Sequence, residues 1–289
     1  MTPADYDYLR ELLRCRSGLV LAADKHYLLE NRLSPIARRL GTVGLGELVA
    51  RLQAAPDEQL TVEIVEAMTT NESFFFRDKV PFEHFSTLVL PKLMMARQRE
   101  RRIRIWCAAA STGQEPYSVA MCVSAMASTL AGWHVEILAT DISADVLERA
   151  EQGIYSHFEV QRGLPIALLL QYFTQVGDKW QIAPQLRSMV TFRPFNLLHD
   201  FARLGVFDVV ICRNVLIYFG PDTKADVLQR LAASMARDGF LMLGGTETVV
   251  GHTQRFRPMP NTRCMYVPHN AVTADCTVIP FARRAAASG

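Results

Sequence analysis

Four polar loops carry side chains that could bind a ligand or take part in a reaction. The segment AAASTGQEP (108–116) is rich in small residues, so its backbone can approach a ligand closely. It runs into a helix, whose free N–H groups favour a negatively charged group. Asp141 lies 28 positions after Gly113, and a carboxylate at such a place commonly accepts hydrogen bonds from ribose hydroxyls. Later loops supply Asn196 and the pair Arg213-Asn214. Together they predict a site for an adenosine-bearing cofactor.

Two other interpretations of this loop pattern stay open. Asp141 could merely cap the helix formed by ISADVLERA (142–150), because Asp and Ser are common at helix starts. A nicotinamide enzyme is the second alternative, but it would be expected to carry G-x-G-x-x-G. The loop has a single glycine, Gly113, which counts against a dinucleotide.

The elements that must position these loops are apolar strands alternating with amphipathic helices. Strands are predicted at 103–110, 135–141, 189–192, 207–214 and 240–245, and helices from about Glu115, over 142–153 and over 222–239. This alternation predicts a doubly wound α/β fold with a parallel sheet covered on both faces. Ligands bind such sheets beyond the carboxyl ends of the strands. Residues 165–195 interrupt the alternation and predict a small antiparallel β-subdomain.

Residues 1–68 predict a small all-helical domain. Its first helix should begin at Thr2-Pro3 and end at Gly18. A second helix is predicted from about Asp24 to Leu40, with Pro35 expected to kink or split it. Two shorter helices follow near 45–53 and 57–68. At the other end, 269–289 has little periodicity and is expected to be a loose tail.

Composition narrows the class of protein. The 289 residues carry a formal net charge of +2, too little to imply a nucleic-acid partner. Six cysteines without a CxxC pair predict no metal site and suit a reducing compartment. The N-terminus lacks an apolar secretion segment. The uncharged stretch 117–135 contains Ser, Thr and a Gly-Trp break, which favours a buried helix and strand over a membrane span. We therefore expect a cytoplasmic protein that does not insert into membranes.

Five segments in order resemble the motifs of CheR-type chemotaxis protein-glutamate O-methyltransferases. They are TTNESFFFR (69–77), WCAAASTGQEPYSVA (106–120), ATDIS (139–143), FNLL (195–198) and FDVVICRNVLIYF (207–219), and NRLSPIARRL (31–40) and LGGTET (243–248) also match. The resemblance covers roughly residues 5–267. It implies a helical domain at 1–68, a linker at 69–80 and a Rossmann-like class I methyltransferase domain at 81–268, with the β-subdomain inserted. The implied cofactor is S-adenosylmethionine, with S-adenosylhomocysteine as product.

The resemblance also implies roles for single residues. The cofactor would be bound by Asn71, Ser73, Arg77, Glu115, Asp141, Asn196, Leu197, Arg213 and Asn214, and Arg77 and Tyr218 would be catalytic. Ser73 replaces the usual Thr but keeps the hydroxyl group. Arg77 could grip the methionine carboxylate or orient the incoming glutamate. Two other interpretations stay open: Tyr218 could serve only in packing, and Glu115 could serve only the helix dipole.

The implied reaction is methyl transfer to glutamate side chains of chemoreceptors, the methyl-accepting chemotaxis proteins. The basic helix carrying Arg32, Arg38 and Arg39 would dock on their acidic, cytoplasmic helical region, unless it is simply a solvated basic face. The β-subdomain looks shorter than in members that bind a receptor C-terminal pentapeptide, so we expect no such tether. The alternatives are a catalytically weak, CheR-like S-adenosylmethionine sensor and a small-molecule methyltransferase.

Overall fold

The computed structural model describes residues 1–22 and 24–269, so the predicted loose tail lies, apart from His269, outside the described residues. Four helices come first: α1 (Pro3–Ser17), α2 (His26–Arg39), α3 (Leu45–Ala54) and α4 (Glu58–Met68). Thr2 and Asp5 form a reciprocal cap, in which each side chain accepts the other residue's backbone N–H. Helix α1 ends at Gly18, whose φ of 77° is left-handed. The predicted start and end of this helix are confirmed.

The four helices share one apolar core, to which α2 contributes the buried side chains of Leu29, Leu33 and Ile36. The expectation that Pro35 would split α2 is wrong, because the helix continues through Arg39. Pro35 lies on the exposed side of α2. The carbonyl group that loses its helical partner there can be solvated, which lowers the cost of the missing N–H.

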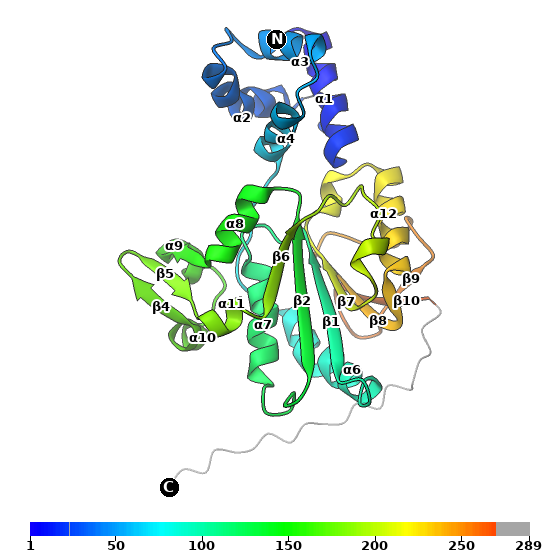
Figure 1. Cartoon of the computed structure of the whole chain (residues 1–289). Coiled ribbons are helices and arrows are strands. Elements are labelled where there is room, and N and C mark those ends of the chain that lie inside the picture. Colours follow the sequence, from blue (N-terminus) through cyan, green and yellow to red (C-terminus); the bar gives the residue numbers. More distant parts are fainter. Residues whose placement is uncertain (23, 270–289) are drawn as a thin grey trace.

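A seven-stranded sheet follows, in the order β6-β2-β1-β7-β8-β10-β9 (Figure 1). Its strands are β1 (Arg102–Ala108), β2 (His134–Asp141), β6 (Val190–Pro194), β7 (Phe207–Cys212), β8 (Met235–Leu243), β9 (Phe256–Pro258) and β10 (Met265–Pro268). The first five are mutually parallel, whereas β10 is antiparallel to β8 and to β9. The predicted α/β methyltransferase-like fold is confirmed.

Helices cover both faces of this sheet. They are α5 (Val80–His84), the π-helical turn η1 (Phe85–Val89), α6 (Leu90–Ala96), α7 (Gln114–Ala125), α8 (Ala144–Gln152) and α12 (Pro221–Ala233). Along β1, Ile105 and Cys107 belong to the core shared with α7, while Trp106 and Ala108 belong to the core shared with α12. Burial on both faces explains why the second half of β1, from Ile105 to Ala108, is apolar without alternation. Among the residues described, no helix is long and apolar enough to cross a bilayer.

The helix predicted over 222–239 ends earlier, at Ala233, and Met235 already belongs to β8. A register shift between Phe207 and Val209 interrupts the pairing of β7 with β8. The start of β8 is thus irregular, and its polar residues do not alternate with apolar ones as in a regular strand. The helix prediction for this reason extended too far, to residue 239.

The β-subdomain is a second sheet of three antiparallel strands in the order β3-β5-β4, seen beside α8 in Figure 1. It comprises β3 (Ile154–Ser156), α9 (His157–Gln161), α10 (Ile166–Tyr172), β4 (Phe173–Val176), β5 (Lys179–Ile182) and α11 (Pro184–Arg187). The sheet thus starts upstream of the expected range 165–195, and β6 at the end of that range pairs with β2 instead. A three-residue strand such as β3 is too short to show a period of two.

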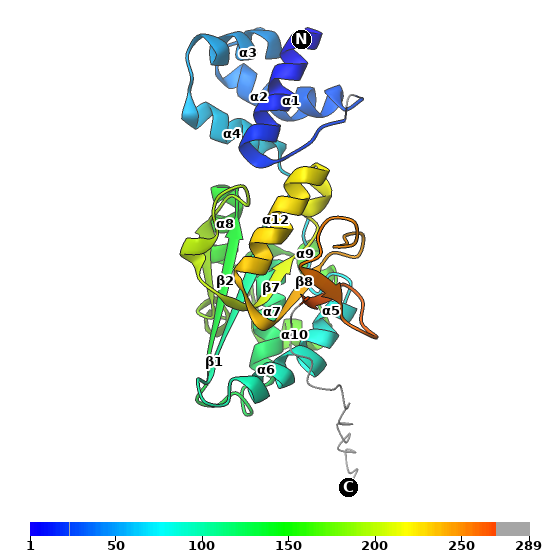
Figure 2. The ribbon, with the colours of Figure 1, turned by 90° about the vertical axis from the view of Figure 1, so that its right-hand side faces the viewer.

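Helices α1–α4 lie beyond one end of the large sheet (Figures 1 and 2). Three hydrogen bonds join them to the loops there: Val20 N–H to the Tyr218 carbonyl (2.9 Å), Asn196 Nδ2 to the Arg16 carbonyl (2.7 Å) and Ala144 N–H to Glu66 Oε1 (2.6 Å). The helical domain therefore covers the edge at which ligands are expected to bind.

Candidate functional site

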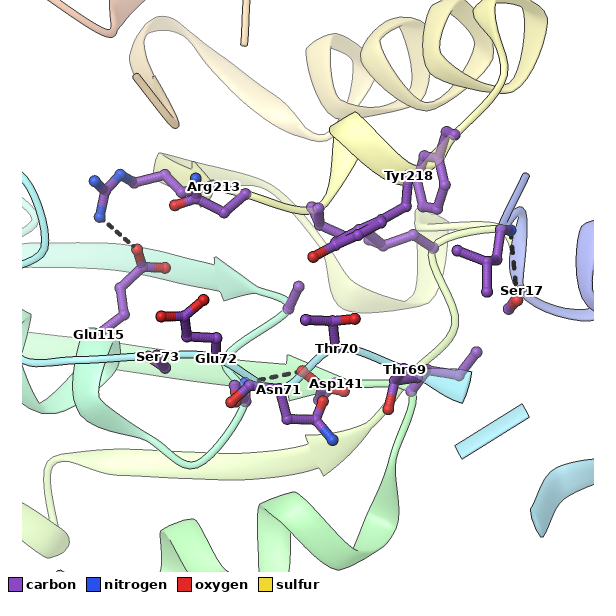
Figure 3. Close-up of a pocket in the computed structure, with 18 of the residues that line it drawn as sticks. Ser17, Thr69, Thr70, Asn71, Glu72, Ser73, Glu115, Asp141, Arg213 and Tyr218 are labelled. Carbon is purple, nitrogen blue, oxygen red and sulfur yellow. Dashed lines mark hydrogen bonds and ion pairs between the residues drawn. The ribbon is translucent and has the colours of Figure 1, made fainter. Parts of the chain in front are cut away.

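A cavity of about 1,020 Å³, including open solvent at its mouth, lies between the ends of β1, β2 and β7 and the helical domain. All ten predicted binding and catalytic residues line it: Asn71, Ser73, Arg77, Glu115, Asp141, Asn196, Leu197, Arg213, Asn214 and Tyr218. Figure 3 shows Arg213 bonded to Glu115 at one side of the view and Tyr218 toward the other side, near Ser17.

Asp141 ends strand β2 with its carboxylate almost fully buried. Its Oδ2 accepts the backbone N–H of Ser111 (2.8 Å), and its Oδ1 accepts that of Ser143 (3.1 Å). Burial raises the pKa of Asp141, and these amides oppose the shift. The N-cap of α8 is Ser143, so the side chain of Asp141 is not the cap. Each carboxylate oxygen has a second lone pair with which to bind a ligand.

Arg213 is the charged centre of the cavity wall. Its side chain is fully buried, with Nη1 donating to Glu115 Oε2 (2.9 Å) and Nη2 to Asp78 Oδ2 (2.6 Å) and to the Arg77 carbonyl (2.9 Å). Burial raises the pKa of Glu115, and Arg213 opposes this shift. The Nε of Arg213 has no hydrogen-bond partner within the described part of the chain. A buried donor without a partner is costly, and it suits a ligand that supplies an acceptor.

The segment 69–77 crosses the cavity as an extended loop held from several sides. The Asn71 carbonyl accepts the Ser111 hydroxyl (3.0 Å). The Arg77 guanidinium donates to the Glu72 carbonyl (3.2 Å) and lies 5.3 Å from the centre of the Phe74 ring. These contacts place Arg77 at the cavity.

Several non-glycine residues at or next to the cavity have left-handed backbone. Ala109, Ser111 and Asn214 line the cavity, and Phe76, Asp78 and Lys79 adjoin Arg77, all with φ between 47° and 69°; Arg101, Asn261 and Cys264 have the same conformation elsewhere. Such conformations persist where the surrounding structure enforces them, and they cluster at functional sites.

Asn196 and Leu197 lie at another edge of the cavity. The amide of Asn196, a predicted cofactor-binding residue, donates to the Arg16 carbonyl and accepts the Leu198 N–H (2.9 Å). It therefore joins α1 to the cavity loop. Leu197 is buried and offers an apolar surface.

The three predicted docking arginines do not line the cavity, and they lie in different environments. Arg32 donates to the carbonyls of Met68 (2.8 Å) and Thr69 (2.6 Å) and to the Thr70 hydroxyl, so it holds the linker. Arg39 is exposed and pairs with Glu63. Arg38 is exposed, and no ion-pair partner for it is found among the residues that the structure describes.

Sequence reasoning missed two contributions to the site. The helical domain itself lines the cavity through Ser17, Leu19, Val65 and Met68, whereas the sequence predicts only a docking role for its helices. Glu247 accepts hydrogen bonds from backbone N–H groups of the loop that follows β7. It lies in the LGGTET segment, whose resemblance to the family assigns no role to this carboxylate.

Comparisons with known proteins agree with this geometry. Residues 4–69 match the family described as CheR methyltransferase, all-alpha domain, and residues 71–265 match CheR methyltransferase, SAM binding domain. The chain belongs to the CheR methyltransferase family. This confirms the resemblance found in the sequence. The chain is therefore an S-adenosylmethionine-dependent chemotaxis protein methyltransferase.

Curated relatives cover nearly the whole chain. It is 40% identical over 251 residues to chemotaxis protein methyltransferase Cher2 of Pseudomonas putida, covering 86% of this chain and 91% of that protein. Identity to chemotaxis protein methyltransferase 1 of Pseudomonas aeruginosa is 42% over 250 residues, covering 85% and 90%. Identity to the chemotaxis protein methyltransferase of Vibrio anguillarum is 39% over 261 residues, covering 89% and 94%.

Proposed function

We propose that this CheR-family protein transfers the methyl group of S-adenosylmethionine to glutamate side chains in the cytoplasmic helical region of chemoreceptors, forming methyl esters. The observation that carries the proposal is the single cavity in which ten residues from distant parts of the chain converge. It combines buried carboxylates for the polar groups of the donor with Arg77 for an incoming carboxylate.

The donor-binding roles follow from charge and burial. Asp141, whose oxygens each keep an acceptor site, accepts the ribose hydroxyls. Glu115 attracts the methionine ammonium group, and the free Nε–H of Arg213 is available to an acceptor on the same end of the donor. Asn71, Ser73 and Asn214 complete the polar wall, and Leu197 packs against the adenine.

The chemistry requires no general base. Bound S-adenosylmethionine supplies a methyl group activated by its positively charged sulfur. The acceptor glutamate, with an unperturbed pKa of about 4.3, is already ionised at neutral pH. Arg77 orients that carboxylate, and the Tyr218 ring walls the acceptor side of the cavity. The helical domain covers the opening, so water competes less for the carboxylate oxygen.

Receptor docking is assigned to the exposed part of the basic helix. Arg38 and Arg39 are exposed and can meet an acidic helical surface, although Arg39 must first release Glu63, whereas Arg32 is engaged with the linker. We further propose, from the family resemblance alone, that no pentapeptide tether is needed, because the β-subdomain looks shorter than in the members that bind one. Calorimetric titration with a receptor C-terminal pentapeptide should give no heat of binding, and a measurable Kd would contradict this.

The test of the proposed function uses the purified protein, S-adenosylmethionine labelled in its methyl group, and the cytoplasmic fragments of chemoreceptors. Label should appear on a fragment and be released by alkali, as carboxyl methyl esters require. Absence of label on every fragment, despite tight binding of the donor, would favour a sensor instead.

A further inference from the structure

A buried carboxylate behind the cavity wall accepts hydrogen bonds from four backbone N–H groups. Glu247 is 8% exposed. Its Oε2 accepts the amides of Asn214 and Gly244 at 2.7 Å each, and its Oε1 accepts those of Val215 and Ile217 at 3.0 and 3.3 Å. No ion pair to Glu247 exists within residues 1–22 and 24–269. The four amides are therefore what compensates the burial of its charge.

Three of these amides belong to the loop that carries Arg213, Asn214 and Tyr218. Asn214 has a φ of 59°, a left-handed conformation that even asparagine adopts only at some cost. The Ile217 amide lies in the 3₁₀ turn η3 (Leu216–Tyr218), where it has no earlier carbonyl in the turn to bond. One carboxylate thus fixes both the unusual backbone at Asn214 and the turn that presents Tyr218.

The fourth amide, from Gly244, ties this loop to the end of the neighbouring strand β8. Gly244 has no room for a side chain: an added Cβ would lie 2.7 Å from Glu247 Oε2, 2.9 Å from Asn214 Nδ2 and 3.0 Å from the Asn214 nitrogen. The carboxylate and the Asn214 side chain therefore both pack against the bare backbone of this glycine. This close approach supports the same role for Glu247 independently of its hydrogen bonds.

We infer that Glu247 is a positioning residue for methyl transfer, which holds the Arg213–Tyr218 loop in its working conformation without touching the donor or the acceptor. Glu247 does not line the cavity, whereas Arg213, Asn214 and Tyr218 do. The role rests on the proposed function, because it acts through residues to which that function assigns donor and acceptor contacts.

The test compares Glu247→Gln, Glu247→Asp and Gly244→Ala with a matched control, Glu148→Gln, which removes a charge from the exposed side of α8. In Glu247→Gln an NH₂ group faces two backbone N–H donors, so the loop must shift. A displacement of about 1 Å can cost on the order of 100-fold in rate, and we expect a loss of that size in kcat at saturating donor. The KM for the receptor fragment should stay within about threefold, because the docking helix is untouched.

The conservative and second-site variants separate positioning from general damage. Glu247→Asp keeps both acceptor oxygens and should recover part of the lost kcat. Gly244→Ala crowds the same contact and should lower kcat at least ~10-fold, so it decides the question if Glu247→Gln does not fold. Equal kcat for folded Glu247→Gln and Glu148→Gln would overturn the inference while leaving the proposed function intact.

Binding of S-adenosylhomocysteine, measured by calorimetry, keeps the inference testable if the wild-type protein methylates no receptor. In that case the proposed function fails, but Glu247→Gln should still weaken the binding about 10-fold, since Arg213 and Asn214 line the cavity. Unchanged affinity in Glu247→Gln would overturn the inference.

Discussion

Replacing Asp141 by Asn should weaken binding of S-adenosylhomocysteine about 10- to 150-fold. Asp141 already accepts two backbone amides, from Ser111 and Ser143, and is assigned the ribose hydroxyls through its remaining lone pairs. In Asp141→Asn one oxygen becomes an NH₂ group, so one acceptor and the negative charge are lost. A hydrogen bond to a charged group contributes about 1.5–3 kcal/mol, which converts to the stated range of Kd.

The assay is isothermal titration calorimetry of the folded variant beside wild type. Asp145→Asn is the matched control, because this exposed aspartate lies four positions along the same segment, and it should bind like wild type. Affinity of Asp141→Asn within twofold of wild type, with an unchanged melting temperature, would refute the assignment of Asp141 to the donor.

The ionisation of Asp141 should make binding of S-adenosylhomocysteine depend on pH. Burial raises the pKa of Asp141 above the ordinary value of 3.8, and only the ionised form accepts hydrogen bonds through both oxygens. Affinity is therefore full above the raised pKa and falls as the pH drops through it, at a higher pH than an exposed aspartate would give. Asp141→Asn should flatten this dependence in part, since Glu115, whose pKa burial also raises, remains.

Two further predictions concern docking and stability. Arg38→Ala should raise the KM for receptor fragments, most strongly at low salt, and leave the affinity for S-adenosylhomocysteine unchanged. Arg32→Ala should weaken that affinity, because it releases the linker. Equal effects of the two variants in both assays would contradict the assignment of Arg38 to docking and of Arg32 to the linker. Arg97→Ala should destabilise the fold by about 3 kcal/mol in urea unfolding, because it leaves the buried Asp208 without its ion pair. Arg97 also pairs with Asp238 and lowers its pKa, so the stability that comes from the Arg97–Asp238 pair is present above the unfolded pKa of Asp238 and is lost as pH falls through the lowered value. A stability difference between wild type and Arg97→Ala that grows on acidification would contradict this pairing.

The sequence predicted the strand-end site well, because its signals are local. Small residues before α7 and a carboxylate at the end of β2 can be identified from spacing alone, and parallel strands bring their carboxyl ends together. Helix α1 was equally clear, since Thr2, Asp5 and Gly18 determine its ends through neighbouring residues. This topology accounts for the site residues that follow strands, whereas Asn71, Ser73 and Arg77 lie in the linker before β1 and were named from the resemblance to the family.

Features that depend on contacts distant in sequence could not be predicted. The hydrogen bonds of Arg32 to Met68 and Thr69 join residues that are 36 and 37 positions apart in the sequence. The hydrogen bond between Asn196 and Arg16 joins residues that are 180 positions apart. A basic helix looks the same in sequence whether its arginines face a partner or their own chain. Glu247 was overlooked for the same reason, since its partners are backbone amides, which have no signature in the sequence.

In the proposed function the cavity delivers a methyl group to a carboxylate. Mass spectrometric mapping of a receptor fragment incubated with the protein and S-adenosylmethionine locates the added methyl group. We predict the added methyl group on glutamate side chains, removable by mild alkali and absent when Arg77 is replaced by Ala. A methyl group on lysine, arginine or another alkali-stable position would contradict the account.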